Sequence, residues 1–321
     1  MSTSTSTNTQ PSDVFKTFPE FSRLTLQDRK KFEALVHDYP PLSDLTFSTL
    51  MNWWNALDSC AVSTLNGNLI MSYWVAGMEK MSGISMMGME QVDETICSIF
   101  DGQRAKGDEP RLVHVSEFVI ERMQHPELFR CTPERNHDEY ILEIAKYYPL
   151  NRTVSFRRQR IKKFLAKTGD QEVSVRNIDL SVEESRKRLL RYAKEWANKG
   201  IINSIAKYVD DGMVVAIEKA EYLGTEALGL YVGDRLQSFI LYAPQVADKR
   251  FVVFSHALVR YEIPYTSDYM VYAFAQWFSD RGVLFVNIDS DLGIPVLRML
   301  KLALGPVNYF RKYTIEPASD A

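Results

Sequence analysis

A coarse repeat between the two halves of the chain most constrains how it can fold. In each half, helical segments precede a hairpin with a polar turn, and a strand that runs into a helix follows later. The hairpin turns at Gly67 and Gly233 are 166 residues apart, and the strands around Val113 and Phe285 are 172 residues apart. An offset of about 170 residues indicates two similar lobes, although two unrelated α/β domains also give such an offset by chance.

The local pattern in each lobe mixes strands and helices. Apolar, β-branched stretches flank the turns Asn66-Gly67-Asn68 and Gly233-Asp234-Arg235, which predicts two hairpins. Thr132-Pro133 can open a helix that reaches Tyr148 and stops at Pro149. We therefore predict a mixed α/β (α+β) protein of two tandem lobes, each a mixed sheet flanked by helices.

The length of 321 residues suits two domains of ordinary size. The first residues are mostly Ser, Thr, Asn and Gln, which predicts a disordered tail over residues 1–17. Pro149 marks the boundary between an N-terminal domain at 18–150 and a C-terminal domain at 151–317.

Composition excludes several classes of protein. Three cysteines, far apart, do not form a disulfide framework or a paired zinc motif, and the five histidines include no HxxxH pair, so we expect no metal. The chain has no GxGxxG, P-loop or GxSxG motif. No apolar run reaches the ~20 residues of a membrane span, and the N-terminus lacks the apolar core of a signal peptide, so we expect a cytoplasmic protein without a transmembrane segment.

One segment is strongly basic although the net charge of the chain is −3. The helix expected over 155–169 carries Arg157, Arg158, Arg160, Lys162, Lys163 and Lys167. Such a helix can be a solvated face or a phosphate-binding surface. RNA, an anionic lipid headgroup and the pyrophosphate of coenzyme A all fit the second interpretation.

A second segment places polar residues where a strand ends and a helix begins. Asp289 and Asp291 follow the strand 283–287, and Gly293 lies beside the N-terminus of the next helix, a place that favours anions. Arg298 and Lys301 are three residues apart and share a face of that helix. We expect Asp291 beside a cleft with both cations near it. The alternative is that these residues are capping carboxylates and surface cations.

These residues resemble the phosphatidylglycerol lysyltransferase C-terminal domain family. The resemblance rests on Asn287-x-x-x-Asp291-Leu-Gly-x-x-x-Leu-Arg-x-x-Lys301-x-x-x-x-Pro306, followed by Lys312-Tyr313. It is supported by Arg157-Arg158-Gln159-x-Ile161-x-x-Phe164 and by Leu24-Thr-x-x-Asp28 with Tyr39-Pro40-Pro41. It spans about residues 18 to 315.

The resemblance implies two tandem lobes with the GCN5-related N-acetyltransferase (GNAT) fold. It also implies an enzyme without a cofactor that moves an aminoacyl group from aminoacyl-tRNA to a lipid or to a small hydroxyl or amine acceptor, with peripheral membrane contact among its expected interactions. On this interpretation Asp289 and Asp291 bind the ammonium group of the aminoacyl donor or activate the acceptor. Arg298, Lys301 and Lys312 hold phosphate or developing negative charge, and the basic helix, with Gly293, contacts tRNA phosphates.

Two other functions stay open. The first is an acyl-CoA-dependent N-acyltransferase on the same fold, although the chain lacks the Arg/Gln-x-x-Gly-x-Gly/Ala run of that class. The second is a ligand-binding relative without catalysis, because Asn287-Ile288-Asp289 stands where the family shows Asn-Arg-Glu.

Overall fold

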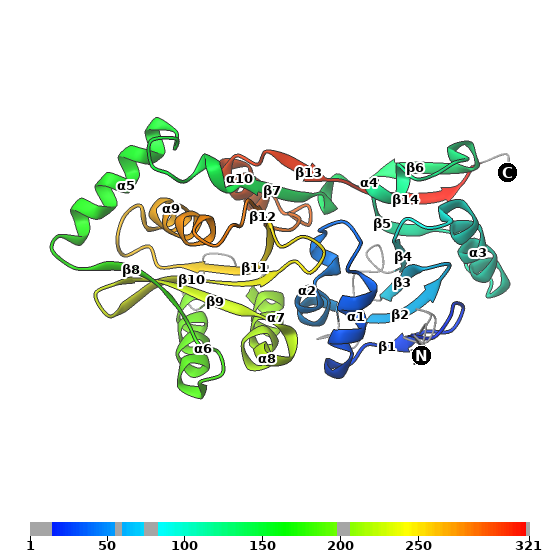
Figure 1. The fold of residues 1–321 in the computed structure, drawn as a ribbon, viewed down its shortest axis with the longest axis horizontal. Helices are drawn as coiled ribbons and strands as arrows, with labels where there is room; N and C mark the ends of the chain where they lie inside the picture. The colour runs from blue at the N-terminus through cyan, green and yellow to red at the C-terminus, as the bar shows by residue number, and fades with distance from the viewer. Residues whose placement is uncertain (1–14, 55–59, 74–82, 198–205, 319–321) are drawn as a thin grey trace, which may run out of the picture. The chain divides into compact units, whose positions relative to one another are not determined.

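The computed structural model describes residues 15–54, 60–73, 83–197 and 206–318 (Figure 1). The chain forms two compact units that alternate along the sequence. Unit 1 comprises residues 1–39, 57–134 and 311–321, and unit 2 comprises residues 40–56 and 135–310. The expected domains, 18–150 and 151–317, were consecutive, whereas these units are interleaved. Residues 1–14 of the expected tail lie outside the described residues, but Thr17 forms a bridge to Thr64.

Unit 1 is built on a seven-stranded mixed sheet with the order β1-β2-β3-β4-β5-β14-β6. Only the β4–β5 pair is parallel among its ladders. Its helices and strands are β1 (Ser22–Arg23), α1 (Arg29–Leu35), β2 (Cys60–Leu65), β3 (Asn68–Tyr73), β4 (Gly83–Met87), α3 (Val92–Ala105), β5 (Leu112–Ser116), α4 (Glu117–Ile120), β6 (Phe129–Pro133) and β14 (Lys312–Pro317).

Unit 2 is built on a second seven-stranded sheet with the order β13-β7-β12-β11-β10-β9-β8, in which β11 and β12 are parallel. Its helices and strands are α2 (Phe47–Thr49), β7 (Glu139–Glu143), α5 (Ser155–Thr168), β8 (Val173–Asn177), α6 (Glu183–Ala197), α7 (Ala206–Glu218), α8 (Ala220–Leu223), β9 (Glu226–Val232), β10 (Arg235–Pro244), β11 (Phe251–Val259), α9 (Thr266–Ser279), β12 (Phe285–Asn287), α10 (Pro295–Leu304) and β13 (Asn308–Phe310).

The two sheets repeat one topology, as the sequence offset predicts. In each, antiparallel strands lead through a helix to a parallel strand: β4–α3–β5 in unit 1 and β11–α9–β12 in unit 2. Two antiparallel strands then complete each sheet. In unit 1 one of them, β14, comes from the end of the chain, and in unit 2 one of them, β7, precedes the rest of the sheet in sequence. The exchange of β14 places the end of the chain in unit 1, and residues 40–56, which join unit 2, account for the rest of the interleaving.

The helix expected from Thr132 to Tyr148 is wrong. That stretch instead supplies the end of β6, a short turn and β7. The β7 backbone pairs with β12 and β13, more than a hundred residues later in the chain. Tyr140 at its centre is fully buried. Long-range pairing therefore decides the structure of this stretch, which its local pattern does not reveal.

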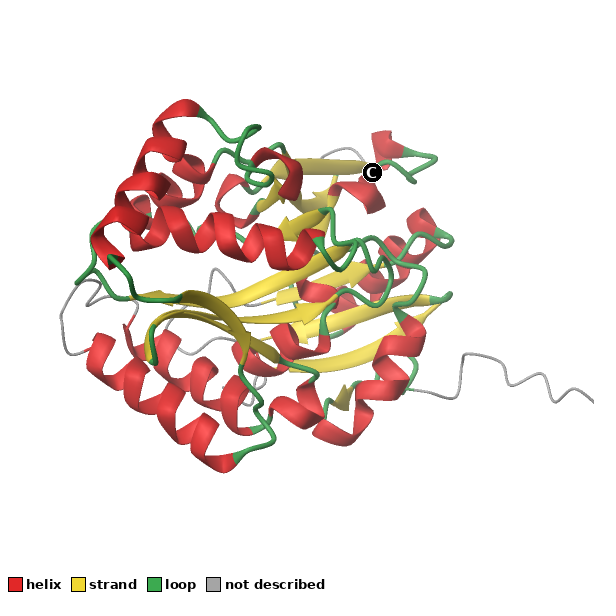
Figure 2. Ribbon diagram, turned by 60° about the vertical axis from the view of Figure 1, so that its left-hand side comes forward, coloured by secondary structure: helices red, strands yellow, loops and turns green. Residues whose placement is uncertain are grey.

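The core of unit 2 lies on both faces of its sheet, and Figure 2 shows helices on either side of the strands. Successive strand residues point to opposite faces, so Leu228 packs with α5 and α9 while Ala227 packs with α6, α7 and α8. In unit 1, α3 packs on the sheet through Ile96, Ile99 and Phe100. The expected mixed α/β class, two mixed sheets flanked by helices, is confirmed. In the described part of the chain, no helix has both the length and the apolar character needed to cross a bilayer.

Candidate functional site

The candidate site lies where β12 ends and the chain turns into α10. We call residues 288–294 the β12 loop. Asp289, Leu292 and Gly293 have positive φ angles of 59°, 52° and 73°. Such a cluster of left-handed residues next to a sheet edge is unusual and often marks a functional site. At Gly293 an added Cβ would lie 2.9 Å from the Asn136 amide nitrogen, so close approach as well as φ requires glycine here.

Asp291 anchors the β12 loop and is fully buried. Arg298 binds both of its carboxylate oxygens, with Nε and Nη2 each at 2.9 Å, and the Gly293 amide donates a third bond at 2.8 Å. The Tyr140 hydroxyl donates a further hydrogen bond, and Arg135 Nη1 lies 3.6 Å away. The expectation that Asp291 faces a cleft is wrong, because every side of the carboxylate is covered by protein. The nearness of Arg298 is confirmed.

The charge state of Asp291 follows from these contacts. Burial raises the pKa of this carboxyl, but hydrogen bonds from Arg298, Tyr140 and the Gly293 amide, with the charge of Arg298, outweigh it and lower the pKa from 3.8 to about 2. The same hydrogen bond raises the pKa of Arg298 above its usual range. Asp291 is therefore a permanent anion that fixes structure and is a poor proton acceptor.

Lys301 lies behind the β12 loop, one helical turn after Arg298 on α10. Its Nζ donates to the carbonyl oxygens of Ile288 and Ser290, each at 2.5 Å. Burial lowers the pKa of Lys301, while the charges of Asp289, Asp291 and Glu139 act in the opposite direction. The ammonium group thus holds the backbone of the loop in its strained path and brings positive charge close to Asp289.

Asp289 is the more accessible of the two loop carboxylates and is half-buried. Its Oδ1 accepts from the Ser290 amide at 2.6 Å and from the Ser43 hydroxyl at 3.3 Å. Beneath it, buried Glu139 accepts hydrogen bonds from the Asn287 side-chain amide at 2.5 Å and from the Ser43 amide at 2.8 Å. The structure brings Asp289, Asp291, Arg298 and Lys301 together, as their spacing predicts.

The polarity of α10 is reversed relative to an ordinary surface helix. Its two cations, Arg298 and Lys301, turn inward to the β12 loop. Its apolar side chains turn outward and are exposed: Val296 39%, Met299 61%, Leu300 48% and Leu302 45%. Arg298 and Lys301 are themselves partly buried. An apolar face of this kind indicates an interaction surface.

The basic helix α5 divides into a buried and an exposed set. Arg157 is buried, donates to the Ala303 carbonyl at 3.2 Å and lies 3.8 Å from Asp268. Arg157 is therefore a structural residue that ties α5 to α10, although we expected it on a phosphate-binding surface. Arg160 also pairs with Asp268, at 3.5 Å. Three cations of α5 are well exposed and make no ion pair within the described residues: Lys162, Lys163 and Lys167.

Lys312 belongs to unit 1, so its expected role beside phosphate or developing negative charge stays a prediction. It is buried at the start of β14, where its backbone pairs with Ser116 of β5 in unit 1. The sequence motif joined it to Lys301 by closeness along the chain, but the strand exchange separates the two residues into different units.

Several residues of the site were not singled out from sequence. Tyr140, Arg135 and Glu139 come from or just before β7, a stretch that was interpreted as a helix. Ser43 comes from a short segment that joins unit 2 ahead of α2. No local signal identifies them, because each reaches the β12 loop through contacts over 96 residues or more along the chain.

Unit 1 holds a second polar pair that the sequence did not reveal. His114 on β5 has a φ of 55°, and its Nδ1 contacts the Glu134 carboxylate. Thr314 of β14 donates to the same carboxylate, and the Tyr73 ring stacks on His114 with centroids 5.6 Å apart. This pair ties β5 to the exchanged strand β14.

Three solved structures share the fold over nearly the whole chain. A conserved protein of unknown function from Bacteroides thetaiotaomicron VPI-5482 covers 93% of this chain and 99% of its own, with a TM-score of 0.78 and 19% identity. The DUF2156 C-terminal domain of a protein described as a lysylphosphatidylglycerol synthetase from Agrobacterium fabrum covers 92% and 94%, with a TM-score of 0.61 and 10% identity. L-PGS from Bacillus licheniformis covers 91% and 92%, with a TM-score of 0.59 and 14% identity.

These similarities confirm, at the level of the fold, the resemblance drawn from the sequence motifs. Neither the protein-family models nor the curated proteins give a match. The shared fold covers residues of both units in each comparison.

Proposed function

We propose that this protein is an acyltransferase that moves an aminoacyl group from aminoacyl-tRNA to a lipid acceptor, with a small hydroxyl or amine compound as the alternative acceptor. The observation that carries the proposal is the similarity of more than 90% of the chain, both units included, to a domain described as that of a lysylphosphatidylglycerol synthetase and to L-PGS. A fold alone does not define a reaction, so the assignment depends on the β12 loop and the surfaces around it.

The β12 loop can perform the chemistry that such a transfer needs. The donor ester is already activated, so the enzyme has to position both substrates and stabilise charge. Asp289, half-buried and close to Lys301, suits the aminoacyl ammonium or the acceptor proton. Asp291 and Arg298 act through Asp289 by fixing the loop, and they are positioning residues in this scheme.

The donor tRNA would contact α5. Lys162, Lys163 and Lys167 project into solvent from a helix of fourteen residues, and Arg158 is half-buried beside them. Clustered cations bind a polyanion by releasing its counterions. The contact between Arg157 and the α10 backbone places the N-terminal end of α5 next to the C-terminal end of α10.

The outward face of α10 supports a lipid acceptor. Met299, Leu300 and Leu302 are exposed on α10, and Phe156, 53% exposed, lies at the start of α5 with Arg160 5.5 Å from its ring centre. Apolar side chains beside lysine and arginine are the composition of surfaces that bind anionic membranes. A lipid docked there would lie on the side of α10 opposite the β12 loop, so its headgroup would have to reach the loop past an end of the helix.

A direct test is whether the protein carries RNA when purified at low salt. The proposal predicts an elevated ratio of absorbance at 260 to 280 nm and a tRNA-sized band on a denaturing gel, both lost after a wash at about 1 M salt because counterion release no longer favours binding. Added coenzyme A should not compete with the RNA. Nucleic-acid-free protein that binds acetyl-CoA instead would favour the acyl-CoA-dependent alternative.

A further inference from the structure

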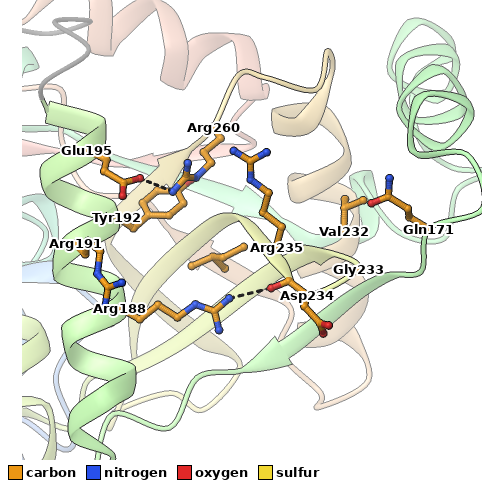
Figure 3. Close-up of a pocket in the computed structure, with 11 residues that line it drawn as sticks. Gln171, Arg188, Arg191, Tyr192, Glu195, Val232, Gly233, Asp234, Arg235 and Arg260 are labelled. Carbon is orange, nitrogen blue, oxygen red and sulfur yellow. Dashed lines mark hydrogen bonds and ion pairs between the residues drawn. The ribbon is translucent and has the colours of Figure 1, made fainter.

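Unit 2 has a pocket of about 580 Å³ that shares no residue with the β12 loop. It lies between α6, the turn from β9 to β10, and the residue that follows β11 (Figure 3). Its volume is in the range of small-molecule sites. The proposed transfer reaction assigns this pocket no role.

Arginines dominate the rim of the pocket. Four of its lining residues are arginines, Arg188, Arg191, Arg235 and Arg260, against two carboxylates, Glu195 and Asp234. Arg188 and Arg191 are three positions apart on α6 and so lie on one side of that helix. Figure 3 shows the four guanidinium groups around the hollow.

One of the two carboxylates is closely paired, and the other is fully exposed to solvent. Glu195 pairs with Arg260 at 2.7 Å, and the Asp234 carboxylate pairs with Arg176, outside the pocket lining, at 3.6 Å. Arg188 donates instead to the Asp234 backbone carbonyl at 3.0 Å, and no described carboxylate pairs with it. The ion pair of Arg191 with Glu184 is long, at 3.7 Å, and exposed, so it contributes little. Arg235 pairs with Glu262, outside the pocket lining, at 2.6 Å. Positive charge therefore remains available on Arg188 and Arg191.

The floor of the pocket is apolar and fixed. Leu236 and Val232 are buried there, and the buried Tyr192 ring lies 4.5 Å beneath the Arg260 guanidinium. The Tyr192 hydroxyl donates to the Gln237 carbonyl at 2.7 Å, which locks the ring in place. A ligand that fills the pocket thus has an apolar or aromatic body over this floor and anionic groups at the rim.

We infer that this pocket binds a small organic phosphate that carries at least two negative charges. Guanidinium groups match phosphate oxygens in geometry and charge, and no carboxylate among the described residues closely neutralises Arg188 or Arg191. The site goes beyond the proposed transfer reaction and does not depend on it.

Calorimetric titration of the full chain tests the inference with ADP, inorganic pyrophosphate and adenosine as probes. We expect saturable 1:1 binding of ADP, weaker binding of pyrophosphate, which lacks the body, and no measurable binding of adenosine, which lacks the charge. Arg188→Gln with Arg191→Gln should weaken ADP binding by about tenfold or more, since two charge-assisted contacts are lost. Among the described residues, neither Arg188 nor Arg191 pairs with a buried carboxylate, so the melting temperature of the double variant should stay unchanged.

The matched control is Lys187→Gln with Lys194→Gln, which removes the same charge from exposed positions of α6 that do not line the pocket. This variant should bind ADP like the unmodified protein. Equal loss in both variants, unchanged binding after Arg188→Gln with Arg191→Gln, or no binding of ADP and pyrophosphate at millimolar concentration would each overturn the inference. A short RNA oligonucleotide that binds through Arg188 while ADP does not would also overturn it.

Discussion

Arg298 donates hydrogen bonds to both carboxylate oxygens of Asp291, from Nε at 2.9 Å and from Nη2 at 2.9 Å. This contact connects the β12 loop to α10. The pair accounts for the reversed polarity of α10. With the cations of the helix held inward, its apolar side chains are left on the outer surface. One buried ion pair therefore shapes both the candidate catalytic loop and the candidate lipid surface.

Asp291→Asn should destabilise the protein markedly. The amide cannot accept from both Arg298 nitrogens and from Tyr140 and Gly293, so the partly exposed Arg298 guanidinium loses its anion and buried hydrogen bonds at Asp291 are broken. We therefore expect a fall of several degrees in melting temperature, because buried polar groups are left without partners. Asp280→Asn, on an exposed aspartate after α9, is the control and should leave the melting temperature unchanged. A variant at Asp291 as stable as this control would contradict the structural role.

Stability should also fall in acid through Asp291. Its folded pKa, about 2, lies below the ordinary value of 3.8, so the folded state binds the proton less readily than the unfolded state. The stabilisation is complete above the ordinary value and is lost as the pH falls from 3.8 towards about 2. Denaturant unfolding at a series of pH values should show a steeper decline for the unmodified protein than for Asp291→Asn. Parallel curves would argue against the shift.

Reversing charge on α5 should weaken RNA binding. Lys162→Glu with Lys163→Glu changes two exposed cations, and we expect tRNA affinity at low salt to fall by roughly tenfold or more, with a shallower dependence on salt concentration. Lys30→Glu with Lys31→Glu, two exposed residues of α1, changes the net charge equally and should leave affinity nearly unchanged. Filter binding between roughly 50 and 200 mM salt measures both. Affinity that is indifferent to salt would rule out α5 as a phosphate surface.

Exposed apolar residues of α10 should govern membrane contact. Met299→Gln with Leu302→Gln removes two side chains that are 61% and 45% exposed, so folding should be unaffected. Cosedimentation with anionic phosphatidylglycerol vesicles should drop several-fold. Leu128→Gln, an exposed apolar position in unit 1, should cosediment like the unmodified protein. Equal cosedimentation of all three proteins would remove α10 from any lipid-binding role.

Features encoded by short spacings were predictable from sequence. The hairpin turn at Gly67 and the grouping of Asp291, Arg298 and Lys301 each follow from residues close together in the chain, and the repeat of topology follows from the order of such local signals in each half. The buried position of Arg157 was also predictable from sequence. It precedes Ile161 and Phe164 by four and seven positions, so it lies on the buried stripe of α5 rather than on its solvated face.

The strand exchange could not be predicted in this way. β7 acquires its structure from β12 and β13, and β14 from β5 and β6, through pairings that no local period encodes. The error in the helix expected over 132–148 follows from that exchange. Tyr140 and Glu139 were missed for the same reason, because they meet the β12 loop only after β7 has joined the sheet of unit 2.

The central claim is aminoacyl transfer, and following a labelled aminoacyl group tests it most directly. The protein is incubated with a mixture of radiolabelled aminoacyl-tRNAs and, in separate reactions, with phosphatidylglycerol vesicles or small hydroxyl and amine acceptors. We predict that label leaves the acid-precipitable tRNA and appears in the lipid fraction. Asp289→Asn should abolish this transfer without lowering the melting temperature, because Asn also tolerates the left-handed backbone at this position. Label that stays on tRNA with every acceptor, or transfer that survives in Asp289→Asn, would contradict the account.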